Sequence, residues 1–555
     1  MTEQRRLSLS YIVFNNNLKI DLDPNSIVVF VGPNNSGKSQ ALRDMYNYLH
    51  TPKPGIVINH CYFNPLDATI IKNMLEKYHK DNKYNGNGFN FFDSTINGHT
   101  TSERGLSEMR NAFVSFMDTK NRLNSIDPIE CLDHGDPITQ SMHLVAYNKE
   151  HSEKLSVHFK NTFNTDIEPY IGGRHLVFSV GNMPVIDEND PKEIKNLYEK
   201  YLREMPKLHN QGDGMKSFSS IIINSMDELN SIIMIDEPES FLHPPQAKEM
   251  GMYLGRNIEE KQLFITTHSI DIINGLIETA HNRLKIIRIT RTENNNDFSI
   301  LNNEEVADLH NNYALAYTNV LDGIFHNKVV LCESESDCKF YSWILSKIYK
   351  GRGEYSDILF IGVGGISGFK SISDALKSLS VDVVIIADLD FMTDSDKLIE
   401  LIDNTHSNNK DEIKAYCKLL LKHIAPNGGE RNISKKDITS ILESNSNEYL
   451  NSDEIAKIKE MFKFSINKKI KQDGIRLFKD DPTIFDIYLK LDSLLKIHGI
   501  VLVPVGELES FVPEEKSNTK HGFTWIRAVL GKYTDEHDPV YSEVTDFVEK
   551  NIAER

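Results

Sequence analysis

The segment that most constrains the fold is GPNNSGKS, which spans Gly32 to Ser39 and follows the apolar run SIVVFV at residues 26–31. It matches the pattern G-x-x-x-x-G-K-[ST] at every fixed position, and the helix-like segment ALRDMYNYL follows it. In this pattern the backbone N–H groups surround phosphate, a lysine reaches the β and γ oxygens, and a hydroxyl ligates Mg²⁺. The sequence therefore predicts an ATP site made by Gly32, Asn35, Gly37, Lys38 and Ser39.

An acidic residue pair at the end of a later strand completes the expected nucleotide site. SIIMIDEPES reads as a buried strand that ends at Asp236, which we expect to hold Mg²⁺, and Glu237 is positioned to polarise the attacking water. TTHS places His268 at the end of a further strand, where it would sense the γ-phosphate. QGDGMKS contributes Gly214 and Ser217 as a degenerate signature at a helix N-terminus, and the alternative is a plain glycine-rich helix start.

The order of these motifs resembles the ABC ATPase superfamily. The resemblance implies that Ser217 and Gly214 face the nucleotide of a second subunit, so that the ATPase heads would assemble as a homodimer or a tetramer. No apolar run approaches the ~18–20 residues that a bilayer span requires, so no membrane association is expected.

A second set of acidic residues follows two further strands. NKVVLCE ends at Glu333 and is followed by Asp337, and VVIIADLD ends in the pair Asp388 and Asp390. Because the carboxyl ends of neighbouring parallel strands meet at one sheet edge, we expect these side chains to converge. Clustered carboxylates repel one another unless cations neutralise them, and oxygen ligands suit Mg²⁺ or Mn²⁺. The sequence therefore predicts a divalent-metal site, although a D-x-D pair alone is also common at a solvated strand end.

Glu333, the glycine turn GVGG at 362–365 and DLD resemble the TOPRIM domain, and the Glu333–Asp337 spacing resembles the OLD-family nucleases. That resemblance implies a second metal site at Glu507 and Glu509, within GELESF. Ser334 stands where many TOPRIM domains have glycine. The family's late catalytic lysine is assigned to Lys520, with Lys516 as the alternative.

Length and composition fit a soluble α/β protein with two domains. The chain has 555 residues, of which 39% are hydrophobic and 26% charged, so more than one core is expected. We predict an ABC-type P-loop ATPase domain at residues 1–320, with a helical or irregular insertion at about 50–205, and a TOPRIM domain at 325–555, with a helical insertion at about 392–495. The polar N-terminus favours a cytoplasmic location, and the five scattered cysteines read as reduced structural thiols.

Charge bears on the substrate. The formal net charge of −18 argues against a protein that coats nucleic acid nonspecifically, but a nuclease needs only a local basic strip. Such a strip is present in KFSINKKIKQDGIRLFK, whose basic residues could contact phosphates and whose phenylalanines could stack on bases. The favoured alternative is that the basic residues form a solvated helix face. The phenylalanines could equally be core contacts. The basic and aromatic residues of the strip are Lys463, Lys468, Lys469, Lys471, Arg476, Lys479, Phe464 and Phe478.

The combined order of domains resembles OLD-family ATP-dependent nucleases, which act in anti-phage defence in Gabija, retron and PARIS-like systems. The resemblance implies an ATP-regulated, metal-dependent endonuclease that cleaves DNA, with a retron reverse transcriptase and its RNA–DNA product, or a helicase, as the expected kind of partner. Alternatives are a ribonuclease acting on transfer RNA and a non-cleaving ATPase scaffold. The expected catalytic residues are Glu237, His268, Glu333, Asp388, Asp390 and Lys520.

Overall fold

The computed structural model forms two compact units, residues 1–325 and 326–555, and each is considered separately. The described residues are 6–64, 68–81, 83–86, 89–92, 96, 112–133, 135–182, 191–292, 295–301, 320–353, 357–378, 380–402, 407–425, 435–442, 454–455, 466–516, 522–535 and 538–553. Within these ranges no helix is long and apolar enough to cross a membrane.

The first unit is built on a six-stranded sheet of order β15-β14-β3-β13-β12-β8. Its strands are β3 (Ile27–Val31), β8 (Val114–Met117), β12 (Ile232–Asp236), β13 (Gln262–Thr266), β14 (Leu284–Thr292) and β15 (Asn295–Leu301). All neighbouring pairs are parallel except β14 and β15. Strands β3, β12 and β13 are mostly apolar in sequence and are buried along almost their whole length. This pattern is typical of parallel strands that are covered on both faces.

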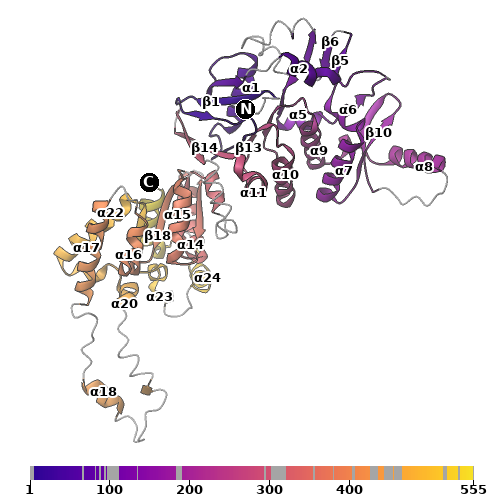
Figure 1. The fold of residues 1–555 in the computed structure, drawn as a ribbon. Helices are drawn as coiled ribbons and strands as arrows, with labels where there is room; N and C mark the ends of the chain where they lie inside the picture. Colours follow the sequence, from indigo (N-terminus) through magenta and orange to yellow (C-terminus); the bar gives the residue numbers. More distant parts are fainter. Residues whose placement is uncertain are drawn as a thin grey trace. The chain divides into compact units, whose positions relative to one another are not determined.

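Helices flank this sheet, and smaller antiparallel sheets adjoin it (Figure 1). The helices are α1 (Lys38–His50), α2 (Ala68–Leu75), α5 (Thr119–Asn124), α6 (Ser141–Ala146), α7 (Lys149–Phe163), α8 (Pro191–Glu204), α9 (Asp213–Met226), α10 (Pro244–Asn257) and α11 (Ile270–Ala280). The small sheets contain β1 (Ser8–Phe14), β2 (Lys19–Asp21) and β4 (Ile58–Asn64), then β5 (His79–Lys80), β6 (Lys83–Gly86) and β7 (Phe89–Phe92), and finally β9 (Ile129–Glu130), β10 (Ile167–Gly172) and β11 (His175–Val180).

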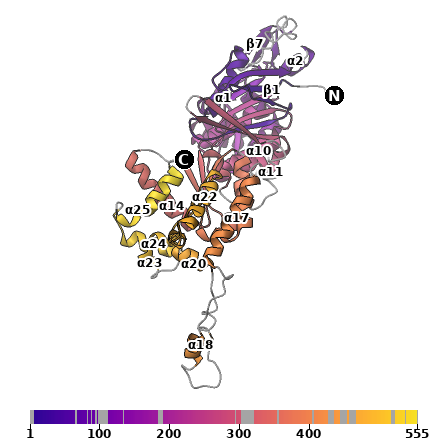
Figure 2. The same ribbon diagram turned by 90° about the vertical axis from the view of Figure 1, so that its left-hand side faces the viewer.

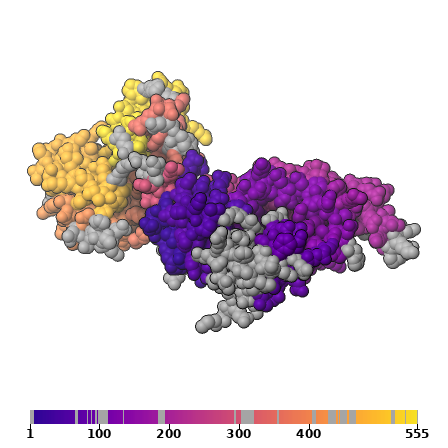
Figure 3. All heavy atoms as spheres, turned by 90° about the horizontal axis from the view of Figure 1, so that it is seen from above, coloured from indigo at the N-terminus to yellow at the C-terminus, as the bar shows by residue number. Residues whose placement is uncertain are grey.

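The range 50–205, which the sequence assigns to an insertion, also contributes to the main architecture. Strand β8 is an edge strand of the central sheet and pairs in parallel with β12. Strand β4 pairs with β1 in the N-terminal antiparallel sheet. In the space-filling view, the indigo N-terminal part adjoins violet segments from this range (Figure 3). The sequence pattern does not indicate β8 because four residues, only two of them buried, give too short an apolar signal.

The second unit contains a four-stranded parallel sheet of order β17-β16-β18-β19. The strands are β16 (Lys328–Cys332), β17 (Ile358–Gly362), β18 (Asp382–Ala387) and β19 (Ile500–Leu502). The helices are α14 (Glu335–Arg352), α15 (Phe369–Ser378), α16 (Ser395–Glu400), α17 (Ser407–Ile424), α18 (Lys435–Leu442), α20 (Ile466–Asp473), α21 (Arg476–Lys479), α22 (Pro482–Ile497), α23 (Pro513–Lys516), α24 (Phe523–Lys532) and α25 (Ser542–Val548).

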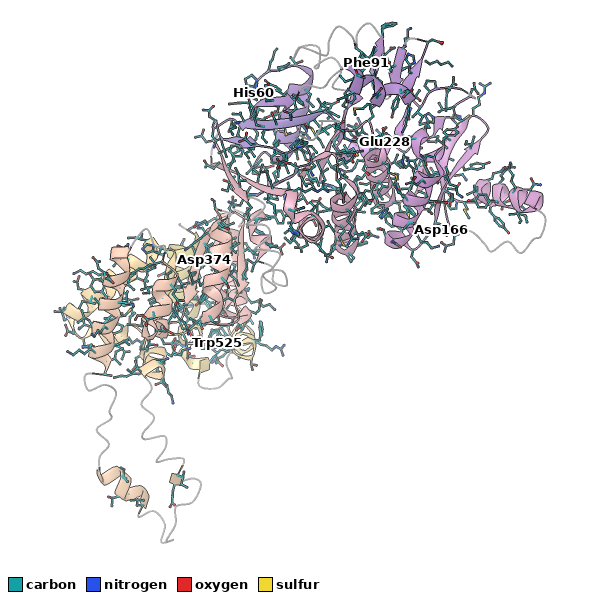
Figure 4. All side chains as sticks on the ribbon, viewed as in Figure 1. His60, Phe91, Asp166, Glu228, Asp374 and Trp525 are labelled. Atoms are coloured by element: carbon teal, nitrogen blue, oxygen red, sulfur yellow. The ribbon has the colours of Figure 1, made fainter. Side chains whose placement is uncertain are left out.

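The sheet of the second unit is covered on both faces. Figure 2 shows α14 and α25 on one side of this unit and α17 and α22 on the other. Trp525 on α24, labelled in Figure 4, is fully buried and packs edge-on against Phe340 on α14, with ring centroids 5.2 Å apart. This core holds the two helices firmly beside the sheet, whose carboxyl edge carries the acidic residues. All five cysteines are free thiols.

Candidate functional site

The phosphate-binding loop joins β3 to α1 and depends on two glycines. Gly32 has φ +137°, and a Cβ at that position would lie 2.1 Å from the Ile289 carbonyl oxygen. Gly37 caps α1 with φ +106°. Lys38 donates from Nζ to the carbonyl oxygens of Gly32 (2.9 Å) and Pro33 (2.7 Å), so its ammonium lies over the loop. Only a residue without Cβ permits this tight path, which leaves the helix N-terminus open to an anion.

The chemistry of this loop fits a nucleotide phosphate. Ser36 Oγ is buried and has no hydrogen-bond partner. Asn35 adopts a left-handed conformation with φ +60°, and Ser39 lies in the first turn of α1. An unsatisfied buried hydroxyl is costly unless a ligand or water completes it. The five residues that the GPNNSGKS segment is predicted to contribute lie on this loop and the start of α1.

The acidic strand end lies two strands away from β3 in the same sheet. Thr266 Oγ1 on β13 donates to Asp236 Oδ1 at the end of β12, where the two residues are paired in register. Glu237 adopts φ +52°, and its N–H donates to the Thr266 carbonyl oxygen over 3.0 Å. These contacts fix the direction in which the chain leaves the sheet, and so they position both carboxylates.

His268 lies two residues beyond the end of β13 and is exposed. Its backbone N–H donates to Glu239 Oε1 over 2.7 Å. Partial desolvation lowers the pKa of His268, and the positive charge of Lys38 lowers it further. Both effects favour the neutral form of the imidazole.

The signature-like residues lie on α9 in a different arrangement from the expected one. Gly214 stands in the first turn, where a Cβ would lie 2.6 Å from the Phe241 carbonyl oxygen. Ser217 is fully buried, and its Oγ accepts a hydrogen bond from Arg122 Nε over 3.0 Å. One turn of helix beyond Gly214, the Ser217 side chain thus lies inside the unit.

Arg122 connects this helix to the acidic strand end. Its side chain is fully buried on α5, and its two terminal nitrogens donate to the carbonyl oxygens of Met117, Asp236 and Glu237. Burial lowers the pKa of Arg122, and nearby carboxylates, chiefly Glu239, oppose that change. The planar guanidinium can satisfy several acceptors at once, which a lysine could not do.

In the second unit, acidic residues follow three adjacent strands at the same edge. Glu333 follows β16, Asp388 follows β18, and Glu507 lies on the turn beyond β19. The backbone N–H of Asp388 donates to Glu333 Oε1 over 3.3 Å. The N–H of Leu389 donates to the Gly506 carbonyl oxygen over 2.8 Å, which ties the D-x-D turn to the turn that carries Glu507.

A lysine lies between these carboxylates. Lys471 on α20 places Nζ 2.7 Å from Asp388 Oδ2, 3.8 Å from Asp390 Oδ1 and 3.7 Å from Glu507 Oε2. The three acidic side chains are between 11% and 21% exposed. A single ammonium thus neutralises part of a negative cluster that is largely shielded from water.

The pKa shifts describe a strongly negative, poorly hydrated cluster. Burial raises the pKa of Asp388 well above its ordinary value, and the charge of Glu333 adds to the shift while Lys471 opposes it. Burial also raises the pKa of Glu333 and of Asp390. For Lys471, burial favours the neutral amine, but Asp388, Asp390 and Glu507 outweigh it and raise its pKa. Clustered acids with raised pKa values are typical of functional sites.

Asp337 and Glu509 form a neighbouring acidic pair. Asp337 Oδ2 accepts the N–H of Ser334, and Ser334 Oγ accepts the N–H of Asp337, which forms a capping box at the start of α14. Burial raises the pKa of Asp337 to about 6, and the charges of Glu333 and Glu509 contribute. Glu509 Oε1 accepts the N–H of Gly522 over 3.1 Å. The serine that departs from the expected glycine therefore has a structural role as a helix cap.

The donor chemistry at this edge fits a hard divalent cation, because every acidic ligand offers oxygen. Among the described residues, however, no group of three or more His, Cys, Asp or Glu side chains is arranged to hold a metal ion as it stands. The Lys471 ammonium lies within 4 Å of Asp388, Asp390 and Glu507. Lys520 lies outside the described residues, and Lys516 is the last residue of α23.

A cavity of about 580 Å³ in the first unit contains none of the predicted site residues. Its lining includes Tyr46, Asn121, Asn124, Asn224 and Asp227. Neither the phosphate-binding loop nor the acidic strand end contributes to it, so its size does not identify it as the nucleotide site.

Comparison with known families assigns both units. Residues 324–390 match the model described as "Overcoming lysogenization defect protein-like, TOPRIM domain". Residues 132–274 match the model described as "AAA domain, putative AbiEii toxin, Type IV TA system". The chain joins an AAA-type ATPase domain to an OLD-like TOPRIM domain. This combination is consistent with the OLD family of ATPase–TOPRIM nucleases and confirms the predicted fold class and resemblance.

Two curated relatives match parts of the chain. The ATPase–TOPRIM chain is 24% identical over 325 residues to the Old nuclease of Escherichia phage P2, a match that covers 56% of this chain and 49% of that protein. The match thus spans about half the length of this relative. An uncharacterized protein of Methanocaldococcus jannaschii is 32% identical over 71 residues, which cover 12% of this chain and 62% of that protein.

Solved structures share only a distant likeness with the ATPase–TOPRIM chain. An Smc head bound to the C-winged helix domain of ScpA gives a TM-score of 0.33 at 12% identity, covering 54% of this chain and 99% of that chain. The SMC head domain from Thermotoga maritima gives 0.29 at 14% identity, with the same coverages of 54% and 99%.

Sequence reasoning missed two residues of these sites. Arg122 lies outside every motif, and no pattern indicates that it reaches the carbonyl groups after β12. The sequence places Lys471 only in the basic strip, for which a solvated helix face is the favoured alternative. Phe478 is fully buried and stacks on Tyr488, so it is a core contact and is not available to stack on a base. Lys463 and Phe464 lie outside the described residues.

Proposed function

We propose that this chain is an ATP-regulated, divalent-metal-dependent endonuclease that hydrolyses phosphodiester bonds in DNA. The observation that carries the proposal is the convergence of Glu333, Asp388, Asp390 and Glu507 on one sheet edge around Lys471, within an OLD-like TOPRIM domain. The printed name of the phage relative, Old nuclease, supports the same activity.

In the TOPRIM unit, the site residues would act by holding and orienting. Glu333, Asp388 and Asp390 would hold a first divalent cation, and Asp337, Glu507 and Glu509 would complete a second site. Mg²⁺ or Mn²⁺, when bound, polarises the phosphodiester and favours formation of the attacking hydroxide. The chain's own contribution is a rigid edge, since the Gly506 carbonyl oxygen and the Glu333 carboxylate fix the backbone of the D-x-D turn.

In the ATPase unit, Lys38 and the N-terminus of α1 would bind the phosphates, and Ser39 and Asp236 would hold Mg²⁺. Glu237 would orient the attacking water, with His268 beside the γ-phosphate. Pairing of two ATPase heads would complete the nucleotide site and control the TOPRIM unit, with Gly214 and the start of α9 at the pairing surface. Because Ser217 is buried, this pairing would use the half-buried first turn of α9.

A role in anti-phage defence, alone or with a reverse transcriptase or helicase partner, follows from the resemblance to OLD-family systems. The proposal includes binding of nucleic acid, assembly with further copies of the chain through the ATPase units, and a location in the cytoplasm.

The test incubates the full chain with plasmid, single-stranded DNA and transfer RNA, with Mg²⁺, Mn²⁺ or EDTA, and with or without ATP. The proposal predicts DNA cleavage that needs the metal and changes with ATP. Cleavage of transfer RNA alone would replace DNA by RNA as the substrate. Absence of cleavage with every substrate and metal would refute the nuclease assignment and favour a non-cleaving ATPase scaffold.

A further inference from the structure

Lys471 lies among the carboxylates of the TOPRIM unit, but the proposed reaction gives it no role. It comes from α20, in the helical segment between β18 and β19, and not from the strand ends that carry the acidic residues. Its side chain is 33% exposed, so it reaches inward from the rim of the site. Three separate carboxylates lie within 4 Å of one ammonium nitrogen.

The backbone around Lys471 is held tightly against the turn that carries Glu507. Ser510 Oγ donates to the Lys471 carbonyl oxygen over 3.0 Å. Gly506 has φ +106°, and a Cβ there would lie 2.5 Å from that same oxygen. Ile470, the preceding residue, is fully buried.

The residues that follow α20 are anchored to the same turn. The N–H of Ile475 donates to the Pro504 carbonyl oxygen over 2.9 Å. A Cβ at Gly474, where φ is +56°, would lie 2.5 Å from that oxygen. Both sides of Lys471 are therefore fixed, and only its flexible side chain can move away from the carboxylates.

Electrostatics makes the ammonium and a divalent cation alternatives. Asp388, Asp390 and Glu507 are shielded from water, so their mutual repulsion is strong without a cation among them. Lys471 satisfies that need, and it does so through Asp388 Oδ2, one of two oxygens that Asp388 can offer to a metal. A lysine ammonium is a compact point charge on a flexible stem, which can enter or leave such a position.

We propose that Lys471 is a built-in counter-cation that holds the acidic cluster together without metal and competes with the divalent cation for Asp388. This inference rests on the proposed function for the identity of the metal site. Lys471 is a positioning residue in this account: it keeps the carboxylates assembled, and metal entry requires its ammonium to move out of the cluster.

Two consequences follow from competition. Replacing Lys471 by a neutral residue leaves the carboxylates uncompensated, so the metal-free protein becomes less stable. The same change removes the competitor, so the metal binds more tightly. In the wild type, metal binding must break the charge-assisted hydrogen bond between Lys471 and Asp388. Without that cost, the Kd for the metal should fall about tenfold. A lysine that only supported the fold would lower stability without strengthening metal binding.

The experiment measures Mn²⁺ binding to the full chain without nucleotide, by calorimetry, for the wild type, Lys471→Gln, Lys471→Arg and Lys468→Gln. Lys468 is exposed on the same helix and provides a matched loss of charge. Competition predicts about tenfold tighter binding and a lower metal-free Tm for Lys471→Gln, with values near wild type for Lys471→Arg and Lys468→Gln. Unchanged or weaker Mn²⁺ binding by Lys471→Gln would overturn the inference.

A second measurement uses the wild-type protein and does not depend on whether a variant folds. Amine-reactive labelling read by mass spectrometry should modify Lys471 more readily with Mn²⁺ than without it, while Lys468 stays unchanged. Labelling of Lys471 that does not respond to Mn²⁺ would contradict displacement. Neither readout requires cleavage, so failure of the nuclease proposal and failure of this inference give different results.

Discussion

Arg122 Nε donates a 3.0 Å hydrogen bond to Ser217 Oγ inside the ATPase unit. The same guanidinium donates to the carbonyl oxygens of Asp236 and Glu237. One buried side chain therefore links the start of α9 to the acidic end of β12. A movement of α9 would therefore displace Arg122 and, through it, the backbone of the residues proposed to hold Mg²⁺ and to orient water.

Arg122→Met should destabilise the ATPase unit and weaken ATP binding. The substitution leaves several buried carbonyl oxygens without donors, at a cost of about 3 kcal/mol or more. Thermal unfolding and ATP titration measure the two effects. Arg256→Met, at an exposed position on α10, is the control and should behave as wild type. Wild-type stability and ATP affinity in Arg122→Met would argue against the link.

Lys38→Ala should abolish ATP binding while leaving the TOPRIM unit able to bind Mn²⁺. Lys38 Nζ now lies on the carbonyl oxygens of Gly32 and Pro33, so nucleotide binding redirects a group that is already in place. Glu237→Gln is the matched comparison, which should keep ATP binding and lose hydrolysis. Titration of fluorescent ATP and measurement of phosphate release distinguish the two variants. Retained ATP affinity in Lys38→Ala would contradict the assignment of the loop.

Lys261 should make stability increase with pH in the alkaline range. It is buried and donates to the carbonyl oxygens of Ser225 and Asp227, both over 2.6 Å. Burial lowers its pKa from 10.5 to about 8. Between these values the folded state has released a proton that the unfolded state still binds, so the free energy of unfolding rises with pH, by about 3 kcal/mol across the window.

The measurement for Lys261 compares denaturant unfolding of the wild type and Lys261→Met between pH 7.5 and 10.5. The difference in free energy of unfolding between the two proteins should change in favour of the wild type as pH rises. A difference that stays constant across that range would show that Lys261 has an ordinary pKa.

Gly506→Ala should destabilise the TOPRIM unit and disturb Lys471. The new Cβ would lie 2.5 Å from the Lys471 carbonyl oxygen at a φ of +106°, a backbone conformation that alanine rarely adopts. The expected cost in stability is about 1–3 kcal/mol, measured by thermal unfolding. Gly351→Ala is the control, because that glycine lies in α14 with nothing within 4 Å of the added Cβ. Equal stability of the two variants would refute the close approach.

Much of this architecture was predictable because its signals are local. GPNNSGKS, at residues 32–39, specifies a tight loop between a strand and a helix, and the buried strands before Asp236 and Asp388 are largely apolar runs. Parallel pairing then brings Glu333 and Asp388 to one edge without further information.

The remaining features depend on tertiary contacts that leave no pattern in the sequence. Lys471 reaches Asp388 across 83 residues, and Arg122 reaches Asp236 across 114. The burial of Ser217 depends on which face of α9 packs inward, and the polar runs around it, KSFSS, do not indicate that face. The sequence therefore gives no indication that Ser217 bonds to Arg122.

The most direct test of the account is metal-dependent DNA cleavage by Asp388→Asn compared with Asp374→Asn. Asp374, labelled in Figure 4, lies on α15 and pairs with Lys370, so its loss removes the same charge outside the cluster. Asp388→Asn should lose cleavage with both Mg²⁺ and Mn²⁺ while it keeps ATP binding, and Asp374→Asn should cleave as wild type. Cleavage by Asp388→Asn at the wild-type rate would place the chemistry elsewhere and contradict the account.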